Sequence, residues 1–323
     1  MHMKTFALLL LATVAFGQQK TVTVKDSLTK QPVPYVSVDL LNSYGVFTNT
    51  NGEAVLNDAS ITAVELSSVG YTTKKIQLNT IATEVYLIPQ SIQLDEVVVA
   101  AKRKLNRKEL VVKPKGHQNE LKMITSFFGQ RYAFYVNPVA GKDNYLTKIA
   151  LPLMEKDFKV NAPGTKEDPF KIIPFKTLIK VEILRNENNV PGEKLNDFKQ
   201  IALIDSKVTP KVFELLLLEE VKIPEDGLFV AFTIIGTAND NGSLATGLPY
   251  DIRSMNGKEV KISKPIQPNF PVLDASKGVL SYTGSSFAEA ATTWVRINRA
   301  LIYDPNKPNE FNIGFGYTTA TYE

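Results

Sequence analysis

The chain has 323 residues, of which 44% are hydrophobic, so it is long enough for two domains and apolar enough to fill their cores. Its 37 Lys and Arg residues against 33 Asp and Glu residues leave a formal net charge of +4, which alone predicts neither nucleic-acid nor membrane binding. The chain has no cysteine, which excludes disulfides, thiolate metal sites and cysteine nucleophiles and suits an oxidising compartment.

Residues 1–17 have the pattern of a secretory signal peptide. Lys4 supplies a positive head, residues 6–16 form an apolar run, and Ala15 and Gly17 place small residues at a cleavage site. We expect cleavage after Gly17, which makes Gln18 the first mature residue; a buried N-terminal helix is the alternative. No cysteine follows the run, so no lipoprotein anchor is expected. We therefore expect an exported protein, in the periplasm, at the outer membrane or outside the cell.

Residues 20–88 alternate between apolar and polar positions in short runs, which predicts β-strands. Val22 and Val24 lie on one face of the first run. Asn51-Gly52 predicts a hairpin between a strand ending near Thr48 and one that contains residues 54–56. About seven such runs without helical periodicity predict a small, seven-stranded antiparallel sandwich.

Four segments of this region carry a family resemblance: VTVKDSLTKQPVPYVSV, GVFTNTNGEAVL, LSSVGYTTKKIQL and SIQLDEVVV. In spacing and residue type they resemble the carboxypeptidase-regulatory-like domain of secreted and outer-membrane proteins of Gram-negative bacteria. The resemblance covers about residues 19–99 and implies an immunoglobulin- or prealbumin-like sandwich. In TonB-dependent receptors the closing LDEVVV leads into the plug, but the chain that follows is too short for such a receptor. The expected first domain therefore spans residues 18–100.

Residues 101–116 form a basic stretch between the expected domains. Its seven cations are Lys102, Arg103, Lys104, Arg107, Lys108, Lys113 and Lys115. Like charges at this density repel, which predicts a solvated linker with at most one short helical turn or strand. A peripheral contact with anionic lipid head groups is the alternative, although an interfacial anchor usually includes aromatic residues.

Residues 117–323 form the expected second domain. The spacing of Leu121, Ile124, Phe127 and Phe128 predicts a short helix within residues 117–129. Residues 237–291 are expected to be mostly loops, which are frequent carriers of binding sites. Strands are expected at residues 131–137, 146–155, 178–186, 199–206, 211–218, 228–236, 294–303 and 309–317.

A jelly-roll β-sandwich fits this order of strands best. The segments KVEILRNENNVPGEKL and IPEDGLFV, within about residues 145–236, resemble galactose-binding-like jelly-roll modules of secreted bacterial proteins. This weaker resemblance implies a binding or assembly module and names no ligand.

No motif for catalysis is evident. His2 lies in the expected signal peptide, so His117 would be the only mature histidine, and neither a metallo-carboxypeptidase site nor a G-x-S-x-G nucleophile is encoded. The segment at 239–243, NDNGS, lacks the downstream Glu of a calcium loop and is expected to be a plain turn. We expect no metal, no cofactor and no enzymatic activity. A carboxylate pair for glycoside hydrolysis stays open in principle, among Asp168, Glu182, Asp205, Glu219 and Glu220.

Aromatic residues near the C-terminal end suggest a ligand site. An exposed Trp or Tyr can stack on the apolar face of a sugar while polar neighbours bind its hydroxyls; burial of Trp294, the only tryptophan, in the sandwich core is the alternative. The candidate ligand-binding residues are Trp294, Arg296, Tyr250, Arg253 and Tyr282.

These observations predict a non-catalytic exported binding or assembly protein of a Gram-negative envelope. Sheet edges or loops would engage an envelope protein as the partner. The alternative is a carbohydrate-binding protein that captures a glycan with the aromatic loops, and a hydrolase is the third hypothesis. No nucleic-acid partner is expected, and no transmembrane segment after signal removal.

Overall fold

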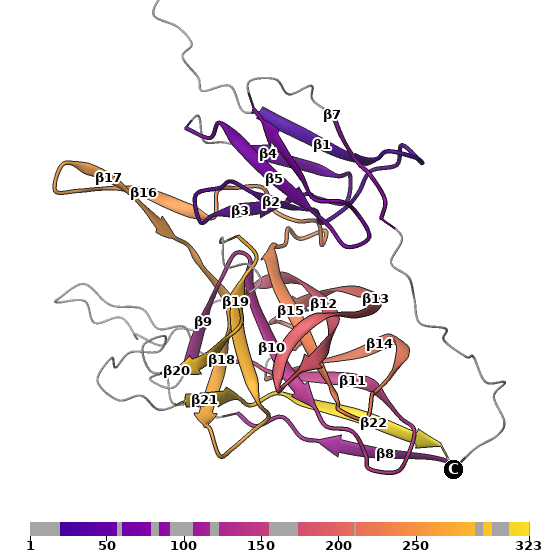
Figure 1. The fold of residues 1–323 in the computed structure, drawn as a ribbon. Coiled ribbons are helices and arrows are strands. Elements are labelled where there is room, and N and C mark those ends of the chain that lie inside the picture. Colours follow the sequence, from indigo (N-terminus) through magenta and orange to yellow (C-terminus); the bar gives the residue numbers. More distant parts are fainter. Residues whose placement is uncertain are drawn as a thin grey trace, which may run out of the picture.

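The computed structural model describes residues 20–56, 60–78, 84–90, 106–116, 123–154, 174–209, 211–287, 293–298 and 310–322 (Figure 1). Every regular element in these ranges is a β-strand, which confirms the predicted all-β sandwich fold. None of the described residues forms a helix long and apolar enough to cross a membrane. The expected signal peptide and the LDEVVV segment lie outside the described residues.

The N-terminal sandwich packs two small sheets around valine and leucine side chains such as Val22, Val24 and Leu66, which are fully buried. Its sheets have the orders β4-β1-β7 and β3-β2-β5-β6. One pairing differs from the antiparallel prediction, because β1 and β7 run parallel, with Val24 opposite Val85. The strands are β1 (Lys20–Asp26), β2 (Ser37–Asp39), β3 (Gly45–Phe47), β4 (Glu53–Leu56), β5 (Ala63–Ser67), β6 (Lys74–Gln77) and β7 (Glu84–Leu87).

The Asn51-Gly52 turn has a different role from the predicted one. Gly52 has a φ of +72°, as a turn requires, but β3 pairs with β2 and β4 pairs with β1, so the turn joins two sheets and closes no hairpin. The preceding Thr48 is fully buried, and its hydroxyl accepts a hydrogen bond from the Val36 amide (2.9 Å) and donates one to the Val33 carbonyl (3.0 Å). The Thr48 hydroxyl thus takes the place of backbone hydrogen-bond partners at the point where the chain passes from one sheet to the other.

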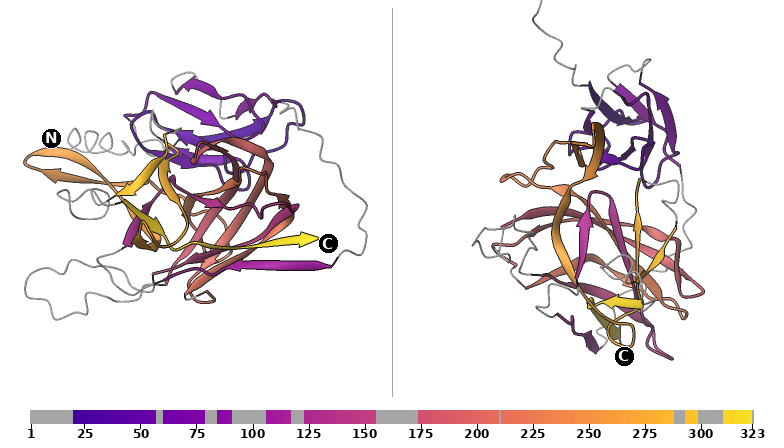
Figure 2. Two further views of the ribbon diagram at one scale, coloured as in Figure 1. Left: turned by 60° about the horizontal axis from the view of Figure 1, so that its bottom comes forward. Right: turned by 90° about the vertical axis from the view of Figure 1, so that its left-hand side faces the viewer.

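The C-terminal sandwich faces a nine-stranded sheet with a four-stranded one (Figures 1 and 2). The larger sheet has the order β13-β12-β15-β10-β19-β20-β21-β18-β9 and the smaller β14-β11-β22-β8. The edge strand β9 is joined to β10, in the middle of the sheet, by only two residues. The nine-stranded sheet therefore curves so that its β9 edge lies near β10. The largest core cluster lies between the sheets and includes Tyr132, Phe134, Phe232 and Phe270.

The bounds of its strands are as follows: β8 (Arg107–Val112), β9 (Met123–Phe127), β10 (Gln130–Val136), β11 (Asn144–Pro152), β12 (Lys176–Glu187), β13 (Val190–Asp205), β14 (Val212–Lys222), β15 (Leu228–Thr237), β16 (Tyr250–Met255), β17 (Lys258–Ser263), β18 (Pro265–Asp274), β19 (Ser281–Ser285), β20 (Val295–Asn298), β21 (Glu310–Ile313) and β22 (Gly316–Tyr322).

Three parts of this sandwich differ from the prediction. The helix expected within residues 117–129 is wrong where the structure describes it, because Met123–Phe127 form β9, which pairs with β18. Residues 237–291, expected as loops, contain β16, β17, β18 and β19. Six residues of the expected linker form β8, an edge strand that pairs with β22. Residues 107–112 are therefore the short strand that the prediction allowed within the linker, and not a fully solvated chain.

The two sandwiches pack directly against each other. Their contact, here called the seam, is a cluster of six buried apolar residues. Phe287 inserts its ring between the two sandwiches: a Cβ added at Gly45 of β3 or at Gly129 would lie 2.2 Å from its carbon atoms. The ring also lies 5.1 Å from that of Phe47. The members of the seam are Phe47, Leu178, Ile235, Ala238, Leu244 and Phe287.

Candidate functional site

The five predicted ligand-binding residues lie in two separate places. Tyr282 of β19, Arg296 of β20 and the adjoining Trp294 lie on the outer face of the nine-stranded sheet, which is separate from the main core and has a small buried cluster of its own. Tyr250 and Arg253 belong to β16, in a hairpin that projects from the junction of the two sandwiches (Figure 1). No single site therefore unites all five.

Strand register determines which side chains share the outer face, because residues directly opposite each other point to the same side of a sheet. One row crosses β12, β15, β10 and β19 through Lys180, Thr233, Arg131 and Gly284. The next row begins at Lys199 of β13 and continues through the other strands. Its remaining members are Glu182, Ala231, Ala133, Tyr282 and Arg296.

Trp294 lies partly buried on this face, outside the main core. Its ring packs over Gly284, where an added Cβ would lie 3.4 Å from Trp294 Cε3. The guanidinium carbon of Arg131 lies 4.4 Å from a ring centroid of Trp294, within cation–π range. The indole therefore contacts both the backbone of β19 and a cation, and these contacts use part of its ring surface.

Tyr282 and Arg296 form the adjacent part of the face. Tyr282 is buried against Phe229, with ring centroids 5.8 Å apart, and its hydroxyl donates to the carbonyl of Asn189 at 2.7 Å. Arg296 lies 5.3 Å from the Tyr282 ring and donates to the carboxylate of Glu310 at 3.1 Å and the side-chain oxygen of Asn312 at 3.0 Å. These contacts use the hydrogen-bonding groups that a sugar would need.

A cluster of charged residues lies on the β12–β13 side of the same face. Glu182 is almost completely buried, and its Oε1 contacts the ammonium groups of Lys194 at 2.8 Å and Lys180 at 3.4 Å. Lys199 lies directly opposite Glu182 in register. Burial alone would raise the pKa of Glu182, but the charges of Lys180 and Lys194 outweigh it and lower the pKa to about 2. We call Lys180, Lys194 and Lys199 the lysine cluster.

The projecting hairpin, here called the arm, consists of β16 and β17 and forms a two-stranded sheet of its own. Its turn is Asn256-Gly257, with positive φ at both residues, as a tight two-residue hairpin requires. Tyr250 anchors the base, because it is buried in the core of the N-terminal sandwich, 4.5 Å from the ring of Tyr44. The Tyr44 hydroxyl also donates to the carbonyl of Lys261 at 3.3 Å. Tyr250 is thus a structural anchor, and Arg253 lies exposed further along the arm.

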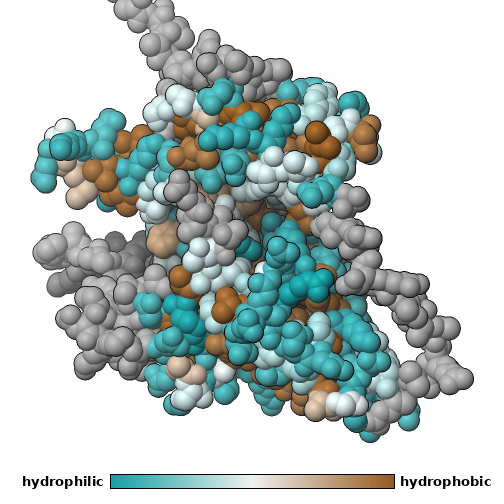
Figure 3. All heavy atoms as spheres, viewed as in Figure 1, coloured by the Kyte–Doolittle hydropathy of each residue, from teal (hydrophilic) through white to brown (hydrophobic). Residues whose placement is uncertain are grey.

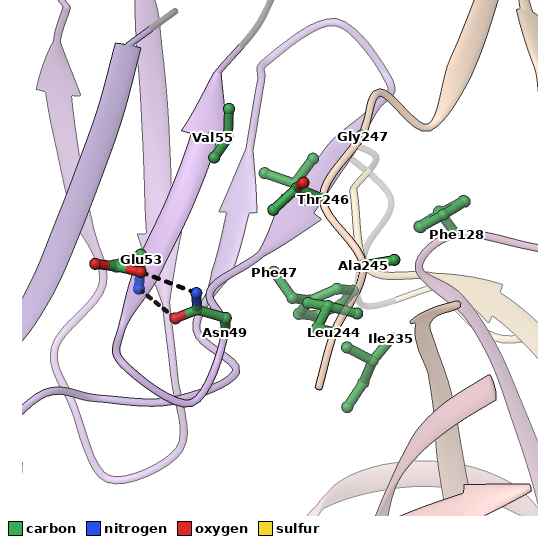
Figure 4. Close-up of a pocket in the computed structure, with 11 residues that line it drawn as sticks. Phe47, Asn49, Glu53, Val55, Phe128, Ile235, Leu244, Ala245, Thr246 and Gly247 are labelled. Carbon is green, nitrogen blue, oxygen red and sulfur yellow. Dashed lines mark hydrogen bonds between the residues drawn. The ribbon is translucent and has the colours of Figure 1, made fainter. Parts of the chain in front are cut away.

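Two openings occur where the sandwiches meet. One, of about 20 Å³, has room for about one water molecule. Its walls include Phe47 and Leu244, and Asn49 donates a hydrogen bond to Glu53 at its side (Figure 4). The other, of about 150 Å³, lies beside Tyr44 and Phe128, and Gln130 on its wall already donates to the Gly284 carbonyl at 3.1 Å. Neither gathers charged side chains as the lysine cluster does.

Several of the remaining sequence candidates make local contacts. Asp205 forms an ion pair with Lys176 at 3.7 Å, and the Ser243 amide and hydroxyl both donate to Asn241 within the 239–243 turn. Of the carboxylate candidates, Glu182 is ionised and paired with two lysines, so it has no proton to donate as a general acid. Asp168 and His117 lie outside the described residues. Within the described ranges, no three His, Cys, Asp or Glu side chains gather as a metal site requires.

Sequence reasoning missed the lysine cluster and the contact of Arg131 with the ring of Trp294. Lys180 and Glu182 alternate with the buried Val181 and Ile183, which is the signal that could have placed both charges on one outer face. The link to β13 depends on a bulge that shifts register between Glu182 and Leu184, which alternation does not reveal. A scan against protein-family models finds no match to the chain, and a search of curated proteins finds no significant relative.

Proposed function

We propose that the protein is an exported, non-catalytic binding or assembly module of the bacterial envelope, and that the arm is its contact with a protein partner. The observation that carries this proposal is the geometry of the arm. Its two strands pair only with each other among the described residues, so no described strand covers their outer edges. Such an edge is suited to adding a strand from another chain.

Side chains on the arm favour a particular kind of partner. Register places Arg253 opposite Val260 and Met255 opposite Lys258, so these four side chains share one face. Figure 3 shows apolar surface among polar surface on the arm, where Ile252 and Met255 are 52% and 53% exposed. Apolar patches flanked by cations fit an extended segment with apolar and acidic residues. We therefore take the occupant to be an acidic extended segment of an envelope protein.

Anchoring supports the same function. Because Tyr250 is buried in one sandwich while β17 continues into β18 of the other, both domains support the base of the arm. A rigidly presented edge loses less conformational entropy on binding than a free loop does. The two-domain arrangement thus gives the arm a fixed direction.

The test is site-specific photo-cross-linking in Gram-negative cells that export the chain. A photoreactive residue replaces Met255 on the arm, and a matched control replaces Leu218, an 81% exposed leucine of β14. We expect one dominant adduct with an envelope protein from position 255 only. That protein, once purified, should bind the chain at least about tenfold more weakly when Ile252, Met255 and Val260 are changed to Ser. Equal adducts from both positions, adducts of the chain with itself, or none would contradict the proposal.

Glycan capture, the alternative function, has less support on this surface. Tyr282 is almost fully buried, and Arg131 lies over the ring of Trp294. A panel of soluble and insoluble polysaccharides tests it directly. Saturable retention that Trp294→Ala abolishes, without loss of folding, would favour the glycan function over the arm proposal.

A further inference from the structure

We propose that the lysine cluster on the outer face of the nine-stranded sheet binds a phosphate group. The phosphate would belong either to a soluble phosphorylated ligand or to a lipid head group. This site lies on β12 and β13, away from the arm, and does not depend on the function proposed for the arm.

Geometry brings the three lysines to one carboxylate. Lys180 and Lys194 both contact the same oxygen of Glu182, at 3.4 and 2.8 Å, and Lys199 lies opposite Glu182 on the neighbouring strand. Glu182 is 3% exposed, so the centre of the cluster lies below the surface. The side chains of Lys180 and Lys194 are 15% and 32% exposed, so the cluster is not fully enclosed.

The charges of this group do not balance. Among the described residues, Lys180 and Lys194 pair with one carboxylate and Lys199 lies opposite it on the next strand, so three cations in a partly buried place face one anion. Arg131, two strands away on the same face, adds to the positive potential that acts on Glu182 and Lys194. A phosphate monoester carries about 1.5 to 2 negative charges at pH 7, and its three oxygens accept hydrogen bonds from ammonium groups. It matches the cluster in charge and in hydrogen bonding.

The electrostatic cost of bringing these lysines together supports the same ligand. Burial lowers the pKa of both Lys194 and Lys199, and the positive charge of Lys180 lowers each further. Protein interiors rarely keep like charges together unless an opposite charge joins them. An incoming dianion would offset this repulsion, because it approaches three cations at once and meets only one carboxylate that is already ion-paired.

The experiment is calorimetric titration of the mature chain with inorganic phosphate and with pyrophosphate at fixed ionic strength. The test variant is Lys194→Gln with Lys199→Gln, which removes two positive charges and keeps side chains that can donate hydrogen bonds. The control is Lys75→Gln with Lys207→Gln, two exposed lysines elsewhere, so both variants lose the same charge. We expect the test variant to bind pyrophosphate at least about tenfold more weakly and the control to change less than about twofold. Thermal unfolding checks that both variants fold.

A second experiment identifies the source of the phosphate. The same variants are sedimented with vesicles of phosphatidylglycerol in phosphatidylcholine and with phosphatidylcholine alone. Binding to the anionic vesicles that only the test variant loses supports a lipid head group; phosphate binding without vesicle binding supports a soluble ligand. Equal loss in test and control variants, or no binding of either phosphate probe, would overturn the proposal.

Discussion

Phe287 joins the two sandwiches, so its removal should uncouple them. The ring is 2% exposed, and burying an aromatic side chain removes roughly 150–250 Å² from water. At about 25 cal/mol per Å² this burial is worth roughly 4–6 kcal/mol as an upper bound. Alanine retains part of the contact and the small seam relaxes in part, so we expect Phe287→Ala to lower the free energy of unfolding by about 3 kcal/mol.

Urea unfolding with two probes measures this effect. Trp294, the only tryptophan, reports on the C-terminal sandwich, whereas circular dichroism reports on both. Wild type should show coincident transitions by the two probes, and Phe287→Ala should separate them. Leu218→Ala, at an 81% exposed position, is the control and should change the free energy of unfolding by less than about 0.5 kcal/mol.

A double-mutant cycle tests the contact itself. A Cβ at Gly45 would lie 2.2 Å from the Phe287 ring, so Gly45→Ala should cost about 1–3 kcal/mol in the wild type. In the Phe287→Ala background the space is free, and the same change should cost almost nothing. An equal cost in both backgrounds, or a loss below about 1 kcal/mol for Phe287→Ala, would refute the idea that this ring couples the sandwiches.

Four further outcomes are expected. The pKa of Glu182 is depressed from 4.5 to about 2, so its ionisation stabilises the folded state by about 3 kcal/mol above pH 4.5, and this stabilisation is lost as the pH falls toward 2. The difference in the free energy of unfolding between wild type and Glu182→Gln, measured by urea titration, should therefore shrink over that range. Backbone amides of residues 28 and 29 and the Tyr71 hydroxyl donate to Asp26 and lower its pKa, so Asp26→Asn should lower Tm in calorimetry at neutral pH and have less effect in acid. N-terminal sequencing of protein secreted by Gram-negative cells should begin at Gln18. Trp294→Ala should leave retention on the polysaccharide panel unchanged, since Arg131 lies over that ring.

Much of the N-terminal sandwich was predictable because its strands have one buried and one exposed face. In β1, Val22 and Val24 are buried and the intervening residues are not, so the period of two is visible in the sequence. The pairing partners were harder to predict. The turn at Asn51-Gly52 has the composition of a hairpin, but the chain changes sheets there, and the buried Thr48 hydroxyl bonds to Val33 and Val36 at this point.

The C-terminal sandwich was less predictable for two physical reasons. In β9, Ile124 and Ser126 are both buried, so the apolar spacing of Ile124, Phe127 and Phe128 imitates a helix while a serine occupies a core position. The arm has almost no buried residues, so it lacks the apolar alternation by which strands are recognised. Its Asn256-Gly257 turn was the one sequence signal of a hairpin.

The candidate sites depend on contacts between distant residues. Arg131 lies against Trp294 although the two are far apart in the sequence, and Tyr250 is buried by a sandwich whose last described strand ends at Leu87. Composition and periodicity report on neither contact. The residue types therefore suggested binding. Only the folded structure shows that two of the five candidates lie on the arm and three on a sheet face.

Hydrogen exchange on the chain together with its cross-linked partner tests the central claim most directly. If the partner adds a strand to the arm, backbone amides within residues 250–263 should become protected on binding, while those of the exposed edge strand β8 should not change. Protection at β8 or on the outer face of the nine-stranded sheet, with the arm unchanged, would contradict the assignment of the arm as the binding element.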